Sequence, residues 1–257
     1  MHVTVVLPTY NERENIVEVL TRVRSAVPKA RILVVDDGSP DGTADVAQRL
    51  ADEMGMIDVV RRSSKDGLGS AYRFAFGRIF TRSTGSDAGS SDDGSADEAD
   101  VVVTMDSDLS HDPLVIPSMI GAISAGADTV IGSRYVAGGG TENWPIHRRL
   151  LSRWGNRYTG WILSVPVRDC TSGFRAYRLG ALRSIRPETT SAEGYAFLTE
   201  LVVRLSRQGY RIEEIPILFI DRTAGNSKMS GQIIVESMTL VTRWGVSQRL
   251  GRHRSDS

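Results

Sequence analysis

The sequence predicts an α/β protein built on a doubly wound, mainly parallel β-sheet, in a single domain with a C-terminal amphipathic helix. Short runs of β-branched and apolar residues alternate along the chain with segments whose apolar residues recur at helical spacing. Several of these runs stop at polar or acidic residues, as buried parallel strands do where they leave a sheet. The alternation predicts parallel pairing through right-handed crossovers.

Each element follows from a local pattern. Pro8 ends the first strand, and the apolar spacing after it gives one face of a helix. The expected strands are Val3–Leu7, Arg31–Val35, Ile57–Val60, Val101–Met105, Ala127–Ile131, the end of Asp169–Tyr177, and parts of Arg211–Ile220. The expected helices are Ile16–Val23, Ala44–Met54, Gly67–Phe80, one after Pro113, His147–Leu163, Tyr195–Gln208 and Ile233–Arg249. We interpret Gly138–Gly140 as a mobile loop.

The chain divides by composition into two parts. Residues 1–230 are expected to form the α/β domain, and residues 231–257 an amphipathic helix with a basic tail. Within the domain, Ser83–Asp100 contains six acidic residues and no basic or aromatic one. Such a segment buries too little apolar surface to offset its ordering entropy. Residues 83–100 are therefore interpreted as a flexible acidic insertion at the surface.

Composition and charge narrow the class of protein, its partners and its cellular compartment. The 257 residues are 40% hydrophobic and carry a formal net charge of zero, so nothing favours nucleic acid as a partner. Cys170 is the single cysteine, which fits a reducing cytoplasm. The first apolar run is too short for a signal peptide, and no run approaches the roughly 20 residues that span a bilayer. A cytoplasmic protein, soluble or peripheral to a membrane, is expected.

The strongest chemical signal is Asp106-Ser107-Asp108, which follows the expected strand Val101–Met105. Two carboxylates this close raise each other's pKa unless a cation or hydrogen-bond donors compensate. Mg²⁺ and Mn²⁺ prefer oxygen ligands, and Mg²⁺ commonly takes one or two carboxylates together with substrate phosphates. The alternative is that Ser107 or Asp108 caps a helix that begins near Pro113.

Two further strand ends are polar, at Pro8–Glu12 and at Asp36–Asp37. The carboxyl ends of strands in a doubly wound sheet lie along one edge, where ligands bind. Tyr10 is a candidate to stack on a nucleobase, or else an ordinary packing aromatic. The acids of these segments are also good turn and helix-start residues. Five acids at three strand ends are nevertheless hard to assign to turns alone.

Positive groups come later in the chain. Arg134 follows an expected strand, Arg148 lies on an expected helix, and Arg222 and Lys228 flank a loop that contains glycine. Arginine suits bidentate recognition of phosphate, and such a loop can close cations over a diphosphate. The alternative for each of them is a solvated surface charge.

Several segments, in this order, resemble those of the polyprenol-phosphate (dolichol-phosphate) mannosyltransferases, which are inverting glycosyltransferases of family 2 with a Rossmann-like A-type (GT-A) fold. The resemblance covers about residues 3–245 apart from residues 83–100. It is carried by Pro8–Glu12, Asp36–Thr43, Asp106–Pro113, Gly132–Tyr135, Ser172–Arg175 and the Arg222 to Lys228 loop.

The resemblance implies roles for particular residues. Residues that would bind the nucleotide-sugar donor are Pro8, Tyr10, Glu12, Val35, Asp37, Asp106, Ser107, Asp108, Arg134, Arg222 and Lys228. The lipid-phosphate acceptor would be bound by Arg134, Arg148 and Ser152. Asp106, Asp108 and Arg134 would be catalytic. Asp108, Asp106 and Ser110 would hold Mg²⁺ or Mn²⁺, although members of the family often have Gln where this chain has Ser110.

The implied reaction moves mannose from GDP-mannose, the favoured donor, to a polyprenyl or dolichyl phosphate. Because the acceptor phosphate is already ionised, no strong protein base is needed, and Asp169 is interpreted as structural. The lipid acceptor implies contact with the cytoplasmic face of a membrane, either directly or through a membrane-protein recruiter. The helix from His147, with Trp154 and Trp161, and the basic C-terminal tail are the segments expected there.

Other functions remain as alternatives. A family 2 transferase could use UDP-glucose, or could build polysaccharide, but Leu240 stands where the Gln of the Gln-x-x-Arg-Trp motif should be. A dinucleotide-binding oxidoreductase is disfavoured, because Gly67-Leu68-Gly69 lacks its third glycine and does not follow the first strand. A protein that binds a nucleotide sugar without catalysis is the remote alternative.

Overall fold

The computed structural model describes residues 1–85, 100–221 and 238–246. Its central sheet has seven strands in the order β3-β2-β1-β4-β7-β5-β8. These strands are β1 (Val3–Thr9), β2 (Arg31–Asp36), β3 (Ile57–Arg61), β4 (Val101–Thr104), β5 (Thr129–Ser133), β7 (Arg175–Arg178) and β8 (Ile212–Pro216). All neighbours are parallel except β7, which is antiparallel to both β4 and β5. The predicted mainly parallel α/β sheet is confirmed.

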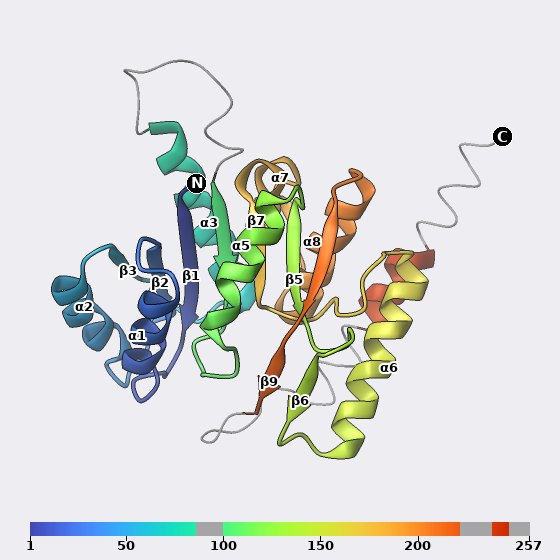
Figure 1. Ribbon diagram of the computed structural model, residues 1–257, viewed down its shortest axis with the longest axis horizontal. Coiled ribbons are helices and arrows are strands. Elements are labelled where there is room, and N and C mark those ends of the chain that lie inside the picture. The colour runs from blue at the N-terminus through green and yellow to red at the C-terminus, as the bar shows by residue number, and fades with distance from the viewer. Residues whose placement is uncertain (86–99, 222–237, 247–257) are drawn as a thin grey trace.

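Helices cover both faces of this sheet (Figure 1). One face packs against α1 (Ile16–Ala26), α2 (Thr43–Met54) and α5 (Ile116–Ser124), and the other against α3 (Leu68–Gly85), α7 (Leu179–Ser184) and α8 (Gly194–Arg207). There are also two 3₁₀ helices in the described chain. The first, η1 (Pro113–Val115), directly precedes α5, and the second, η2 (Pro187–Thr189), lies between α7 and α8. Side chains alternate along the central strands, so Val5 enters one core and Val6 the other. This is why the strands read as continuous apolar runs.

A long helix, α6 (Ile146–Leu163), lies at the edge of the molecule, beside the helical residues 238–246 (Figure 1). Ile162 and Leu163 form a small third core with Val202 of α8 and with Val241. The predicted last helix is observed over residues 238–246, while the rest of Ile233–Arg249 and the basic tail lie outside the described residues. Among the helices that the structure describes, none combines the length and apolarity needed to cross a bilayer.

Two expectations about loops are corrected. Gly140 is not part of a mobile loop but begins β6 (Gly140–Glu142), which pairs with β9 (Leu218–Ile220) in a second, two-stranded sheet. A Cβ atom on Gly139 would lie 2.5 Å from the Ser133 carbonyl oxygen, so this glycine permits a close chain approach. The predicted insertion also starts too early, because α3 continues through Gly85; residues 86–99 lie outside the described part of the chain.

Candidate active site

A cavity of about 330 Å³ lies at the carboxyl ends of the central strands, the position expected for an open α/β sheet. The predicted residues that line it are Pro8, Tyr10, Glu12, Asp37, Asp106, Ser107, Asp108, Arg134 and Arg148. Val35 is fully buried in the sheet, and Ser110 and Ser152 do not line the cavity. Arg222 and Lys228 lie outside the described residues, so their predicted role stays a prediction.

The turn after β1 is hydrogen-bonded to the turn after β2. Asn11 adopts a left-handed conformation, with φ of 57°, which asparagine tolerates better than most residues. Its backbone N–H donates to the Ser39 hydroxyl at 3.0 Å, and the Glu12 N–H donates to the Thr43 hydroxyl at 2.9 Å. These bonds fix the positions of Tyr10 and Glu12 at the cavity.

The two acids after β2 have different environments. Asp36 accepts hydrogen bonds from Thr9 Oγ1 at 3.0 Å and from Ser39 Oγ at 2.5 Å, so the turn-forming interpretation fits it. Asp37 lines the cavity and accepts from Arg62 Nη1 at 2.7 Å. Burial raises the pKa of Asp37 despite the opposing charge of Arg62.

The turn after β4 presents its acids through a strained backbone. Ser107 Oγ donates to the Pro8 carbonyl at 2.9 Å, which ties this turn to β1. Asp108 Oδ1 accepts from the Ser110 N–H at 3.1 Å and from the Ser110 hydroxyl at 2.5 Å. Leu109 between them has φ of 64°, a conformation that a bulky side chain rarely adopts and that often marks functional turns.

The helix-cap alternative for this turn is wrong. The residue that caps the following helical turn, η1, is Asp112, whose side chain accepts from the Leu114 N–H at 3.0 Å. Asp106 and Asp108 instead line the cavity.

The Asp106–Asp108 pair fits a hard divalent cation. Both carboxylates line the cavity, and the backbone at Gly173 approaches so closely that a Cβ there would lie 3.3 Å from Asp106 Oδ1. No cluster of three or more His, Cys, Asp or Glu able to hold a metal occurs among the described residues. A cation here would therefore take two protein carboxylates and complete its shell with substrate oxygens, which is how Mg²⁺ is commonly bound.

Ser110 is poorly placed to be a third ligand. Its side chain is buried, donates its hydroxyl proton to Asp108 and does not line the cavity.

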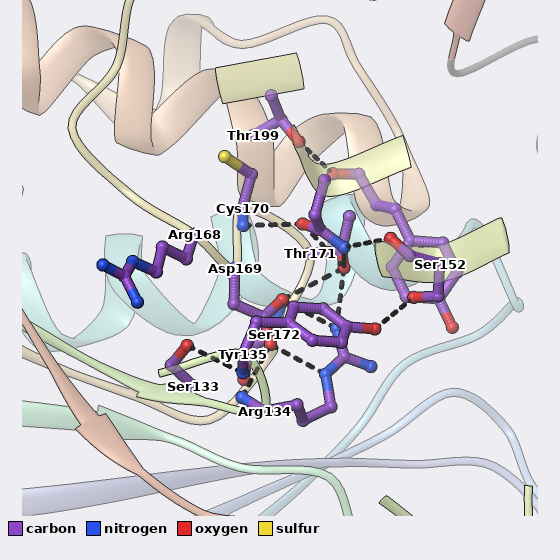
Figure 2. A network of polar contacts seen from close by, with 12 residues as sticks. Ser133, Arg134, Tyr135, Ser152, Arg168, Asp169, Cys170, Thr171, Ser172 and Thr199 are labelled. Atoms are coloured by element: carbon purple, nitrogen blue, oxygen red, sulfur yellow. Dashed lines mark hydrogen bonds and ion pairs between the residues drawn. The ribbon is translucent and has the colours of Figure 1, made fainter. Parts of the chain in front are cut away.

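Arg134 is held in a network of polar contacts (Figure 2). Its Nε and Nη2 each donate to Asp169 at 2.7 Å, and its backbone N–H donates to the same carboxylate at 3.0 Å. Nη2 also donates to the Thr171 hydroxyl at 2.8 Å. Burial alone would raise the pKa of Asp169, but the charge and hydrogen bonds of Arg134 hold that pKa below its usual value. Asp169 is fully buried and does not line the cavity, which agrees with its structural interpretation.

Helix α6 is bonded into this network through Asn156. The Asn156 amide donates to Thr171 Oγ1 at 3.1 Å, and its oxygen accepts from the Cys170 N–H at 2.8 Å. Ser152, one turn earlier on α6, accepts from the Tyr135 hydroxyl at 2.6 Å (Figure 2). The predicted acceptor residues Arg134 and Ser152 are thus joined through α6, although only Arg134 lines the cavity.

A second arginine of the cavity, Arg148, comes from the first turns of α6. It donates to Asp221 at 2.7 Å, and its guanidinium carbon lies 4.1 Å from the ring centroid of Trp144. Arg134 and Arg148 therefore bring two guanidinium groups, each paired with an aspartate, to the part of the cavity near β5 and α6, while Asp37 and Tyr10 line it from the ends of β2 and β1.

Comparison with known proteins decides the family. The model of the family described as "Glycosyl transferase family 2" matches residues 4–186. The chain belongs to glycosyltransferase family 2. It is 43% identical over 251 residues to the polyprenol monophosphomannose synthase of Mycolicibacterium smegmatis, covering 97% of this chain and 89% of that protein. It is also 43% identical to the undecaprenyl-phosphate mannosyltransferase of Micrococcus luteus, covering 97% and 96%.

A solved structure supports the GT-A fold of this glycosyltransferase. Glucosyl-3-phosphoglycerate synthase from Mycobacterium tuberculosis, in complex with Mn²⁺, UDP and glucosyl-3-phosphoglycerate, superposes with a TM-score of 0.55. The match has 22% identity and covers 98% of this chain and 79% of the other.

Sequence reasoning missed several residues that line the cavity of the glycosyltransferase. Lys65 Nζ lies 3.9 Å from the centroid of the Tyr10 ring, and both residues line the cavity. His111, Trp144 and Phe219 also line the cavity. Only His111 carried a signal, since it follows Asp108 by three residues; the others come from segments without a recognisable pattern.

Proposed function

We propose that the protein transfers mannose from GDP-mannose to a polyprenyl phosphate, with inversion at the anomeric carbon. The observation that carries this proposal is that one cavity is lined by Asp106 and Asp108, by Tyr10 and Asp37 from the neighbouring strand ends, and by Arg134 and Arg148. The names of two relatives at 43% identity, both of which act on polyprenyl-type phosphates, support the acceptor and the sugar.

The donor half of the site binds the nucleoside. Tyr10 offers its ring to the base, with Lys65 over the same ring, and Asp37 accepts hydrogen bonds from base or ribose. Pro8, Glu12 and Ser107 complete this wall. Val35 contributes through the register of β2 with Pro8 rather than by its side chain, which is fully buried.

Asp106 and Asp108 would hold Mg²⁺ or Mn²⁺. When bound, the cation supplies charge stabilisation to the departing diphosphate. The structure of the Mycobacterium tuberculosis enzyme, which contains Mn²⁺ and UDP in a related fold, supports a divalent cation here.

The acceptor half binds an anion that is already a nucleophile. A phosphate monoester is largely ionised near neutral pH, so its oxygen attacks the anomeric carbon as the bond to the diphosphate breaks. Arg134 and Arg148 bind and orient this phosphate, with Ser152 supporting them through Tyr135. Attack on the face opposite the leaving group converts an α-linked donor into a β-linked lipid phosphate sugar.

The membrane surface is proposed to meet α6. Its exposed apolar residues recur every one or two turns along one stripe, and exposed arginines flank them. The stripe consists of Ile146, Leu150, Trp154 and Trp161. Trp side chains favour the interface and arginines attract anionic headgroups. Because Arg148 lies on the same helix, docking of α6 would bring the lipid phosphate to the cavity.

Transfer assays test the reaction. Purified protein is offered GDP-mannose or UDP-glucose with a polyprenyl phosphate and Mg²⁺ or Mn²⁺, and sugar that enters the organic phase is counted. We expect mannose to enter, and Asp108→Ala to abolish transfer in chelator-treated, metal-reloaded protein. Transfer of glucose alone would refute the donor assignment, and near-normal turnover of Asp108→Ala would refute the metal site.

Flotation on vesicles tests the membrane surface. The wild type should float with anionic vesicles at low salt and less at high salt. The double variant Leu150→Gln/Trp154→Gln should float less, whereas Val17→Gln, an exposed apolar position on α1, should float like the wild type. Wild-type protein that never floats would instead indicate a separate membrane-protein recruiter.

A further inference from the structure

Three of the residues that line the cavity, His111, Trp144 and Phe219, form an aromatic cluster. Phe219 is its centre, with ring centroids 5.3 Å from His111 and 5.5 Å from Trp144, both in edge-on geometry. His111 also packs against Phe174 at 5.1 Å. The N–H of Ile220, next to Phe219, donates to the Ser110 carbonyl at 3.2 Å, which fixes β9 beside His111.

This cluster contains polar atoms that lack partners. Within the described part of the chain, neither Nδ1 of His111 nor Nε1 of Trp144 has a hydrogen-bond partner, although both atoms are buried. The whole His111 side chain is almost entirely buried, with the residue 4% exposed. An unpaired buried donor or acceptor is costly, and most such groups in native proteins find a partner. An apolar side chain at this position would avoid that cost, so the nitrogen needs a ligand to account for it.

The position of the cluster identifies the ligand. His111 follows the Asp106–Asp108 turn in the chain. The ring centroids of Phe219 and Trp144 each lie 5.6 Å from the guanidinium carbon of Arg134. The cluster therefore lies between the carboxylates that would meet the donor diphosphate and the cation that would meet the acceptor phosphate. In a direct displacement, the group between those two phosphates is the transferred sugar.

We propose that His111 and Trp144 form the subsite for the transferred sugar, and that their rings turn on binding so that the buried nitrogens reach sugar hydroxyls. This inference rests on the proposed function and deepens it. A hydroxyl both donates and accepts, so it can serve imidazole Nδ1 in either tautomer and can accept from the indole N–H. Under the proposed function, Arg134 and Arg148 match the acceptor phosphate and the cation at Asp106 and Asp108 matches the diphosphate, so the sugar is the group left for these nitrogens.

The proposed subsite predicts that changes at His111 affect binding of the sugar but not binding of the nucleotide. Affinities for GDP and for GDP-mannose are measured by calorimetry in the presence of Mg²⁺, and their ratio reports the contribution of the sugar. His111→Phe should lower the affinity for GDP-mannose about tenfold and leave that for GDP unchanged. The thermal midpoint of this variant, measured alongside, reports whether the buried site accommodates the larger phenyl ring.

The same substitution at an exposed histidine, His2→Phe, serves as the matched control and should leave the ratio unchanged. An unchanged ratio in His111→Phe would overturn the assignment, as would equal losses of affinity for GDP and GDP-mannose. A loss that appears only in the Michaelis constant for the lipid acceptor would move His111 to the acceptor site and also overturn it. If His111→Phe does not fold, Trp144→Phe gives the same readings for the other nitrogen.

Failure of the proposed donor can be recognised separately. If the wild type binds GDP-mannose no better than GDP, the donor assignment fails. The same ratio is then measured with UDP and UDP-glucose, where loss of the sugar contribution in His111→Phe supports the subsite and its retention refutes it.

Discussion

Two buried Asp–Arg pairs flank the cavity, and their electrostatics differ. Asp37 makes one contact with Arg62, and the two side chains are 9% and 10% exposed. Asp169 makes a two-pronged contact with Arg134 and accepts two backbone N–H groups as well, with side chains that are 0% and 6% exposed. Burial raises the pKa of Asp37, whereas Arg134 keeps the pKa of Asp169 low against the effect of burial.

The difference separates a binding carboxylate from a scaffold carboxylate. Asp169 has a complete set of partners within the protein, so its charge is satisfied before any substrate arrives. Asp37 is undercompensated and lines the cavity, so a ligand that donates hydrogen bonds improves its environment. A perturbed carboxyl in a cavity is a good candidate for binding, whereas a deeply buried and fully paired one orients its neighbour.

Breaking the Asp169–Arg134 pair should have the largest effect on stability. Asp169→Asn leaves the Arg134 charge buried without its counter-ion, so we expect a loss of about 3–5 kcal/mol in the free energy of unfolding. Urea titration measures this loss, and transfer activity should fall with it because Arg134 is no longer oriented. A loss below about 1 kcal/mol would mean that solvent already compensates this pair.

Loosening the network around the same pair should have an intermediate effect. Asn156→Ala removes the acceptor of the Cys170 N–H and a donor to Thr171, so we expect a loss of about 1–3 kcal/mol. The Michaelis constant for the lipid acceptor should rise more than that for the nucleotide sugar. Equal changes in both constants would show that the network supports the whole cavity and not the Arg134 side.

Removing the charge of Asp37, in the Asp37–Arg62 pair, should barely change stability. Arg62 keeps Asp66 and Ser70 as partners in Asp37→Asn, so the free energy of unfolding at neutral pH should stay within about 1 kcal/mol of wild type, with a small gain expected. Affinity for GDP should nevertheless fall about tenfold, as measured by calorimetry. Unchanged GDP affinity would exclude Asp37 from the nucleoside site.

The smallest effect is a difference in pH dependence. The folded pKa of Asp169 lies below the ordinary 3.8, so its stabilisation is present above that pH and is lost as pH falls through the folded pKa. The folded pKa of Asp37 lies above 3.8, so its ionisation costs stability at neutral pH, and this cost vanishes as pH falls to 3.8.

Unfolding of the wild type and both variants, followed from neutral to acidic pH, should show this contrast. The deficit of Asp169→Asn should shrink only in strong acid, and the small gain of Asp37→Asn should disappear before that. Parallel curves for the two variants would contradict the assigned directions of the pKa shifts.

The sequence predicts the half of the site proposed for the donor better than the half proposed for the acceptor. Asp106 and Asp108 follow directly from a strand end, and Tyr10 and Asp37 from neighbouring ones, because parallel strands bring their carboxyl ends to one edge. Asn156 has no such signal, since its partners are near Arg134 only after α6 has packed. The same holds for Arg62 and for Phe219, whose partners are distant in sequence.

The arrangement of the sheet is likewise only partly predictable. Local patterns locate most strands but not the insertion of antiparallel β7 between β4 and β5, which depends on pairing of β7 with two strands that are distant in sequence. Gly138–Gly140 misleads for the same reason, because its composition indicates mobility while the partner strand β9 lies far along the chain.

Arg175 has a consequence for how the chain folds. Its guanidinium is wholly buried and donates to the carbonyls of Ser172, Cys170 and Leu198, which belong to the Asp169 loop and to α8. A cation can occupy that position only after β7 and α8 have closed around it, since a half-formed enclosure would strand a charge away from water. The acceptor half of the cavity should therefore assemble late and in one cooperative step, and a nascent chain that has not yet added α8 should be catalytically silent however complete its first four strands are.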